Sequence, residues 1–267
     1  MAETMARPRG EMLNKVPEIT AMFWIIKVLG TTVGETGADY LSGTIGIGLV
    51  KTTLIASLVL VAGLVVQFRT RRYVPAVYWP VVVVISIVGT LITDNLTDKI
   101  GVPLEASTAA FAGALALTFA VWYRFEGTLS IHTIYTTRRE AFYWLAILFT
   151  FSLGTAAGDL VSERFAIGYW QSAVIFGAAI GLVALAYYGF GVVGEVTAFW
   201  TAYVLTRPLG ASVGDYLTQP ASRGGLGVSA TTATVMFLGV ILAGVVYLTV
   251  RQRQDDLATE VAWLNEA

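Results

Sequence analysis

The sequence predicts an all-α fold: a polytopic membrane helical bundle of eight transmembrane helices, built as four tandem two-helix repeats with pseudo-symmetry. The composition is the first observation, because 56% of the 267 residues are hydrophobic and 13% are charged, whereas roughly 25% of an ordinary soluble domain is charged. The second is a series of apolar runs close to the roughly 20 residues that a helix needs to cross a bilayer. The third is a polar motif that returns at a nearly fixed period, as structural repeats do.

The motif ends the first apolar run of each repeat. It reads Gly-[Thr/Ala]-x-x-[Gly/Thr]-[Asp/Glu]-x-x-x-[Asp/Glu/Gln]. Each copy places two oxygen-bearing side chains four residues apart, on one face of a helix. The second copy departs from the pattern with Thr93 in place of a glycine, and the fourth ends in Gln219 in place of an acid. The copies occupy residues 30–39, 89–98, 154–163 and 210–219.

The repeats divide the chain in order. We expect a cytoplasmic N-terminal segment (1–16), a single transmembrane domain (17–250) and a tail (251–267) that forms a short cytoplasmic helix and is a candidate for association into a homo-oligomer. The repeats lie at about 17–72, 73–137, 138–192 and 193–250. Their apolar runs predict helices at about 17–39, 46–67, 74–97, 103–123, 141–162, 166–188, 195–217 and 227–250.

Lysine and arginine define the expected orientation, because cytoplasmic loops carry an excess of both. One side of the membrane collects Arg7, Arg9, Lys15, Arg69, Arg71, Arg72, Arg124, Arg138, Arg139, Arg251 and Arg253, and the other has only Lys99, Arg164 and Arg223. We therefore expect both termini in the cytoplasm and the motifs near the outer ends of their helices. Tryptophans near the starts of the same helices predict an interfacial aromatic belt: Trp24, Trp79, Trp144 and Trp200.

Residue types that the sequence lacks exclude several functions. The absence of cysteine rules out disulfides, thiolate metal sites and cysteine nucleophiles. The one histidine, His132, lies in the longest internal loop (124–140), where a solvated side chain is expected. A Walker loop, a His-Glu-x-x-His motif and a cofactor loop are all absent. We expect no enzymatic activity, no bound cofactor and no nucleic-acid partner.

Seven acidic residues of the motifs lie in otherwise apolar surroundings. A charged side chain at the centre of a membrane helix costs roughly 2.5–3.5 kcal/mol on insertion scales, so these residues predict a functional site. The deeper ones are expected to be cation ligands or proton sites: Glu35, Asp94, Asp159 and Asp215. The outer ones either line a vestibule or simply lie in the headgroup layer: Asp39, Asp98 and Glu163. Independently of the acids, paired glycines such as Gly30 and Gly34 predict close approach of helix backbones.

Basic residues accompany the acids in the first and last repeats only. Lys27 and Arg207 lie eight residues before the deep acids of their repeats, where the other copies have Ser86 and Phe151, and Lys51 opens the second helix. One interpretation is that they tune the charge of the acids, or stand in for a cation when the site is empty. The alternative is local ion pairing that only lets the helices insert.

Oxygen-rich surroundings without thiols or imidazoles favour hard divalent cations, Mn²⁺, Mg²⁺ or Ca²⁺. Carboxylates that lie close together also bind protons more readily than isolated ones. The leading hypothesis is therefore a membrane ion transporter that couples export or exchange of such a cation to protons. Pro208 and the motif glycines would allow broken helices at the site. The alternatives are a cation channel with an acid-ring filter, an intramembrane enzyme or lipid-headgroup binder, and a sensor or assembly module. The expected partners are the bilayer, a small inorganic cation and protons.

The Lys15-Val-Pro-Glu-Ile-Thr opening and the Gly-x-x-x-Gly-[Asp/Glu]-x-x-x-[Asp/Glu] copies carry a resemblance over about residues 15–250. They resemble a family of prokaryotic multi-pass membrane proteins built from a tandem repeat of unknown function, described as uncharacterised membrane-anchored proteins. The resemblance implies the repeat architecture and a bacterial or archaeal cytoplasmic membrane. It implies no activity.

Overall fold

The computed structural model describes residues 14–266, and all regular structure in this part of the chain is helical. Arg7 and Arg9 of the expected cytoplasmic segment lie outside the described residues. The prediction of an all-α fold with eight long helices is confirmed. They are α1 (Ala21–Asp39), α2 (Leu49–Arg69), α3 (Pro75–Asp94), α4 (Leu104–Glu126), α5 (Thr137–Asp159), α6 (Tyr169–Ala184), α7 (Glu195–Thr218) and α8 (Ala230–Glu266).

Local sequence signals define several helix ends. Thr20 caps α1, because its hydroxyl accepts a hydrogen bond from the backbone N–H of Phe23 at 3.3 Å. Thr136 caps α5 in the same way, and Pro75 occupies the first turn of α3, where a proline sacrifices no helical hydrogen bond. Gly127 ends α4 in the left-handed conformation that glycine adopts without strain.

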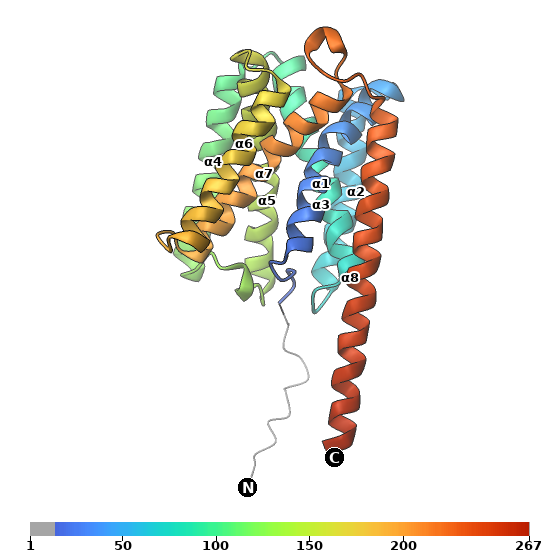
Figure 1. Ribbon diagram of the computed structural model, residues 1–267, viewed down its shortest axis with the longest axis vertical. Helices are drawn as coiled ribbons and strands as arrows, with labels where there is room; N and C mark the ends of the chain where they lie inside the picture. Colours follow the sequence, from blue (N-terminus) through green and yellow to red (C-terminus); the bar gives the residue numbers. More distant parts are fainter. Residues whose placement is uncertain (1–13, 267) are drawn as a thin grey trace.

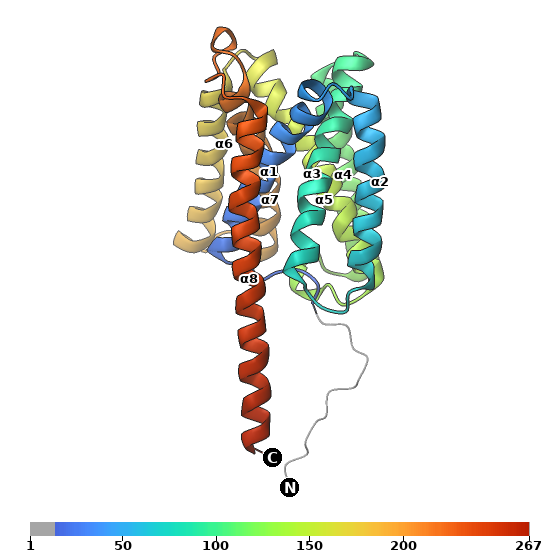
Figure 2. The ribbon, with the colours of Figure 1, turned by 90° about the vertical axis from the view of Figure 1, so that its right-hand side faces the viewer.

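The first helix of every repeat lies in an inner ring, and the second lies outside it. α1, α3, α5 and α7 pack in sequence, and α7 closes the ring against α1. Each outer helix packs against the inner helix of the next repeat: α2 on α3, α4 on α5, α6 on α7 and, closing the circle, α8 on α1 (Figure 1, Figure 2). The repeats therefore interlock.

Motif glycines let the inner helices approach closely, as predicted. The backbone of Gly154 lies so near α7 that a Cβ there would be 2.3 Å from Cγ of Arg207. Small residues permit such contacts between membrane helices, where packing drives association. A contact of this kind joins each of the other neighbouring pairs in the ring: Gly34 with Ser86, Gly89 with Phe151 and Gly210 with Thr31.

Six helices, α2, α3, α4, α5, α6 and α8, are long and apolar enough to cross a membrane. Large apolar side chains on the outer helices are exposed, as expected where they face lipid: Leu58, Leu117, Leu182 and Leu242. The chain is therefore a multi-pass membrane protein. Among the described helices, α1 and α7 lack such an apolar stretch; both lie in the inner ring and carry buried charges.

The tail is helical, as predicted, but it is not a short helix of its own. α8 continues without a break to Glu266 and extends beyond the bundle (Figure 2). No glycine or proline follows Gly244, so the sequence contains nothing that would stop the helix. An exposed ion pair between Arg72 and Asp256, 2.9 Å long, connects this extension to the loop between α2 and α3.

The expectation of a broken helix at Pro208 is also wrong, since α7 runs continuously through it. Pro208 packs closely against α5, since a Cβ at Gly154 would lie 2.9 Å from its Cδ and one at Gly158 would lie 3.6 Å from its Cα. The irregular backbone lies instead directly after Asp39, Asp94 and Asp159, where α1, α3 and α5 each end in a π-helical turn of 5 residues. Such turns frequently occur at functional sites.

Three of the four tryptophans expected in an interfacial belt do not face the lipid, and the fourth, Trp24, is half-buried. Trp79, Trp144 and Trp200 are buried inside the bundle, where they pack with tyrosines of the inner helices. The expectation of an aromatic belt applies to tryptophans that face lipid near the end of a helix. The inner helices are surrounded by other helices, so their tryptophans face protein. We call this group the aromatic tier: Tyr78, Trp79, Tyr143, Trp144, Trp200 and Tyr203.

Candidate functional site

Arg207 lies at the centre of the inner ring and is fully buried. Its guanidinium donates to Oε2 of Glu35 on α1 at 2.9 Å and to the carbonyl oxygen of Thr31 at 2.9 Å. It also donates to the hydroxyl of Thr90 on α3 and, at 2.7 Å, to that of Thr155 on α5. One guanidinium from α7 therefore connects all the inner helices.

The threonines bound to Arg207 are equivalent in sequence. Each follows the first glycine of its motif, and the fourth copy has Ala211 at that position. The fourth repeat has no threonine at this position and contributes Arg207 from four residues earlier. We call this set the arginine layer: Arg207 with Thr31, Thr90 and Thr155.

The deep acids of the motifs face one shared region above the arginine layer. We call them the acid cluster: Glu35, Asp94, Asp159 and Asp215. Glu35 and Asp215 are buried, and the other two are half-buried. Glu35 repels each of the other three electrostatically. Helices from all four repeats thus direct one acid each to the same region.

The outer acids form a gradient of exposure from the acid cluster to the surface. Asp39 is half-buried and interacts electrostatically with Asp98 and Glu163, which are exposed. Glu163 accepts a hydrogen bond from the hydroxyl of Tyr169 at 2.8 Å. These residues lie where α1, α3 and α5 end, opposite the end of the bundle from which α8 extends (Figure 1).

Lys27 is buried on the other side of the arginine layer. Its Nζ makes no hydrogen bond and lies 4.2 Å from the ring centre of Phe151 and 4.1 Å from that of Tyr203. Both rings lie within the range of a cation–π contact. Lys51 differs: it is exposed in the first turn of α2 and makes no ion pair among the described residues.

The side chains do not form a compact metal centre. Within residues 14–266, no three acidic or histidine side chains are arranged to hold one ion. Glu35 points to Arg207, and repulsion within the acid cluster favours separation of its members. The arrangement places four carboxylates above one buried guanidinium.

Sequence reasoning missed a second buried ion pair at the opposite end of the bundle. Nζ of Lys15 lies 2.6 Å from Oε2 of Glu140, and both side chains are 1% exposed. Gln67 completes the group by donating to Oε1 of Glu140 at 3.0 Å. The signal available in sequence was an acid in the first turn of a helix, which is explained equally well by the helix dipole.

Interlocked repeats, membrane-crossing helices and a buried polar centre together define a polytopic, all-α membrane protein. Four segments of the chain match the family described as "Repeat of Unknown Function (DUF347)": residues 22–73, 77–128, 142–191 and 198–254. The chain belongs to this family. No curated protein and no solved structure matches it.

Proposed function

We propose that this protein exchanges a hard divalent cation, Mn²⁺, Mg²⁺ or Ca²⁺, for protons across a prokaryotic cytoplasmic membrane. In this proposal all eight long helices cross the bilayer, both termini are cytoplasmic, and the acid cluster binds the transported ion. The observation that carries the proposal is the convergence of one acid from each repeat above a single buried arginine.

The acid cluster carries more negative charge than its surroundings compensate. Its carboxylates outnumber the buried basic side chains near them, Lys27 and Arg207. Uncompensated charge inside a membrane protein is costly, so the cluster gains stability by taking up either a cation or protons. Both compete for the same oxygens, which links cation binding to proton release. Oxygen ligands without thiolate or imidazole favour a hard cation.

In this proposal the guanidinium of Arg207 occupies the place of the transported cation beside Glu35 when the site is empty. Glu35 is held 2.9 Å from the guanidinium. If Glu35 moved to the cation, Arg207 would keep its bonds to the threonines of the arginine layer. We propose this exchange of partners as the binding step.

A sensor or assembly module whose acids serve only in ion pairs explains less of the geometry. In such a module Asp94, Asp159 and Asp215 would each need a basic partner. Within the described chain, Arg207 pairs with Glu35 alone, and Nζ of Lys27 has no hydrogen-bond partner. Three of the four deep acids are then unexplained.

A channel is disfavoured for a different reason. An acid-ring filter requires a continuous axial pathway for ions. Arg207 and Lys27 are buried on the axis beneath the acids, and the aromatic tier lies below them. Movement of an ion past these side chains requires a conformational change, which is typical of a carrier.

Cation binding by the purified protein tests this proposal. Calorimetric titration in two buffers of different ionisation enthalpy measures both binding and proton release. We expect Mn²⁺, Mg²⁺ or Ca²⁺ to bind with release of protons. Glu35→Gln and Asp215→Asn should each weaken binding by at least about tenfold, because each removes a ligand.

The matched control is Glu105→Gln. Glu105 lies at the same end of the bundle, is exposed, and pairs with Arg164 at 2.8 Å, so this variant should bind like the wild type. Unchanged binding in both site variants would refute the assigned ligands. Absence of binding for all three cations would refute the proposed function.

A further inference from the structure

The charged form of Lys27 is poorly compensated. Its side chain is 1% exposed and its Nζ has no hydrogen-bond acceptor. The groups that face it are the apolar ring of Phe151 on α5 and the ring of Tyr203 on α7. Arg207 repels it electrostatically. Cation–π contacts replace only part of the hydration that a buried ammonium loses.

Of the two buried basic residues near the acid cluster, Lys27 and Arg207, only Lys27 can lose its proton. Arginine retains its proton in proteins, whereas a buried lysine can act as a base. In the described arrangement Glu35 neutralises Arg207. When Glu35 moves to a bound cation, the charge of Arg207 is no longer compensated and its repulsion of Lys27 increases. Loss of a proton from Lys27 relieves this repulsion.

We propose that Lys27 is the residue that releases a proton when the acid cluster binds the cation. This inference rests on the exchange function proposed above and assigns one proton carrier of the cycle. An N–H bond of the ammonium breaks, its electron pair stays on nitrogen, and the proton passes to water. The step reverses when the cation leaves and Glu35 returns to Arg207.

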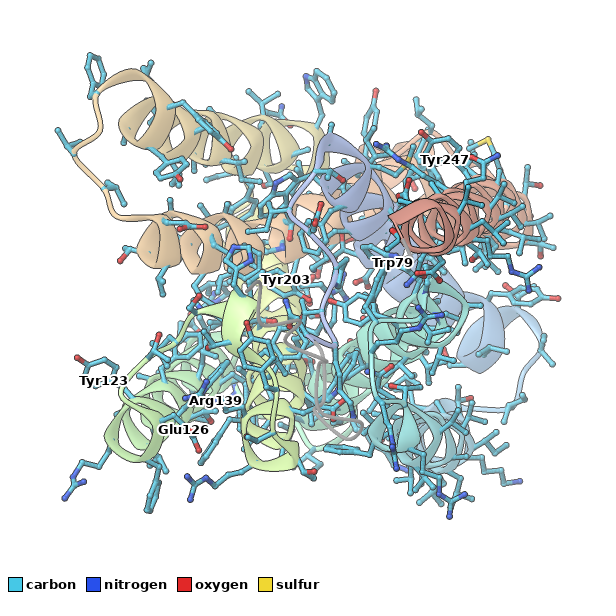
Figure 3. All side chains as sticks on the ribbon, turned by 90° about the horizontal axis from the view of Figure 1, so that it is seen from below. Trp79, Tyr123, Glu126, Arg139, Tyr203 and Tyr247 are labelled. Carbon is cyan, nitrogen blue, oxygen red and sulfur yellow. The ribbon has the colours of Figure 1, made fainter. Side chains whose placement is uncertain are left out.

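Buried tyrosine hydroxyls of the aromatic tier are candidates for the route of this proton. The hydroxyl of Tyr203 is buried without a hydrogen-bond partner, and the hydroxyls of Tyr78 and Tyr143 are hydrogen-bonded to each other. Figure 3 views the bundle from the end where α8 projects, with Tyr203 and Trp79 near the middle and Tyr247 at the periphery. Tyr78 and Tyr143 lie within the first two turns of α3 and α5, so their hydroxyls lie towards the end that we assign to the cytoplasm.

Selective NMR of lysine side chains tests the assignment directly. The other lysines, Lys15, Lys51 and Lys99, are few enough for each signal to be assigned with single Lys→Arg variants. In protein labelled at the lysine side chain and kept at constant pH, Mg²⁺ or Ca²⁺ should move the Lys27 signal from its ammonium to its amine position. The signal of exposed Lys51 should not move. The shift should disappear in Glu35→Gln, which removes the partner exchange.

Transport provides the second measurement and includes Mn²⁺. In proteoliposomes Lys27→Arg keeps the positive charge but cannot release a proton, so we expect it to bind the cation without transporting it. Tyr247→Phe, on the periphery, should transport like the wild type. A Lys27 signal that stays in the ammonium position with and without cation, or full proton coupling in Lys27→Arg, would overturn this inference while leaving wild-type exchange intact. If wild-type protein moves no cation and the Lys27 signal does not respond, both proposals fail.

Discussion

At the scale of single residues, the buried ion pair between Arg207 and Glu35 is the central contact of the candidate site. A single guanidinium satisfies acceptors from each of the other inner helices, so it contributes to structure as well as to the candidate site. The sequence singled out Glu35 as a motif acid and Arg207 by its position eight residues before Asp215. It left open whether the basic residues tune the acids or only pair with them. The structure pairs one of them and leaves Lys27 without an acceptor.

Replacing one member of the buried Arg207–Glu35 pair should lower the free energy of unfolding much more than replacing both. Arg207→Gln leaves Glu35 charged and buried, and should lower the free energy of unfolding by about 3–5 kcal/mol. The double variant Glu35→Gln/Arg207→Gln should recover most of that loss, because no unpaired charge is left behind. Chemical unfolding in mild detergent measures both values.

The control for this prediction is the exposed pair of Arg72 and Asp256, whose side chains are 52% and 48% exposed. Arg72→Gln should cost about 1 kcal/mol or less, because solvent screens exposed pairs. Equal losses in Arg207→Gln and in the double variant would contradict the pairing seen in the structure.

The ion pair between Lys15 and Glu140 could not be predicted from the sequence. Lys15 and Glu140 are separated by 125 positions, and neither belongs to the repeated motif. Nothing in one sequence links them, whereas the repeats link the motif acids by position alone. The sequence could therefore predict only those residues of the buried polar groups that belong to the repeated motif.

At the scale of elements, apolar runs located every long helix, but the helix ends followed other rules. α1 begins at Ala21, because Thr20 caps it, and not near residue 17 as expected. The π-helical turns after the motifs in α1, α3 and α5 produce no periodic signal in sequence. Motif glycines were more informative, because small residues at helical spacing imply close helix contacts.

A matched pair of glycine variants tests those contacts. Gly154→Ala should lower the free energy of unfolding by about 1–3 kcal/mol, since its methyl group would overlap Arg207. Gly181→Ala in α6 meets no other atom within 4 Å and should be neutral or stabilising by up to about 1 kcal/mol. Thermal unfolding of both variants, compared with wild type, measures the difference. Equal effects would contradict the close approach of α5 and α7.

At the scale of the whole molecule, the repeat count followed from the sequence. The interlocking did not. The packing of each outer helix on the next repeat, with α8 closing on α1, depends on long-range contacts that no local pattern encodes. The consequence is that the repeats share one buried centre, so that a single Arg207 can serve all four.

Cysteine labelling tests the proposed orientation, and the chain contains no native cysteine. Ser222 lies in the turn between α7 and α8, at the end with the outer acids, and Thr259 lies on the projecting part of α8; both are exposed. In intact cells a membrane-impermeant maleimide should label Ser222→Cys and not Thr259→Cys. The reverse result would invert the proposed topology, and labelling after lysis is the control for accessibility.

Transport by the purified protein in liposomes tests the central claim most directly. A pH dye inside the vesicles reports protons while Mn²⁺, Mg²⁺ or Ca²⁺ is supplied outside. The account predicts cation-dependent proton movement in wild type and in Glu105→Gln, and none in Asp215→Asn. Folded wild-type protein that moves no protons for any of these cations, or Asp215→Asn that moves them at the wild-type rate, would contradict it.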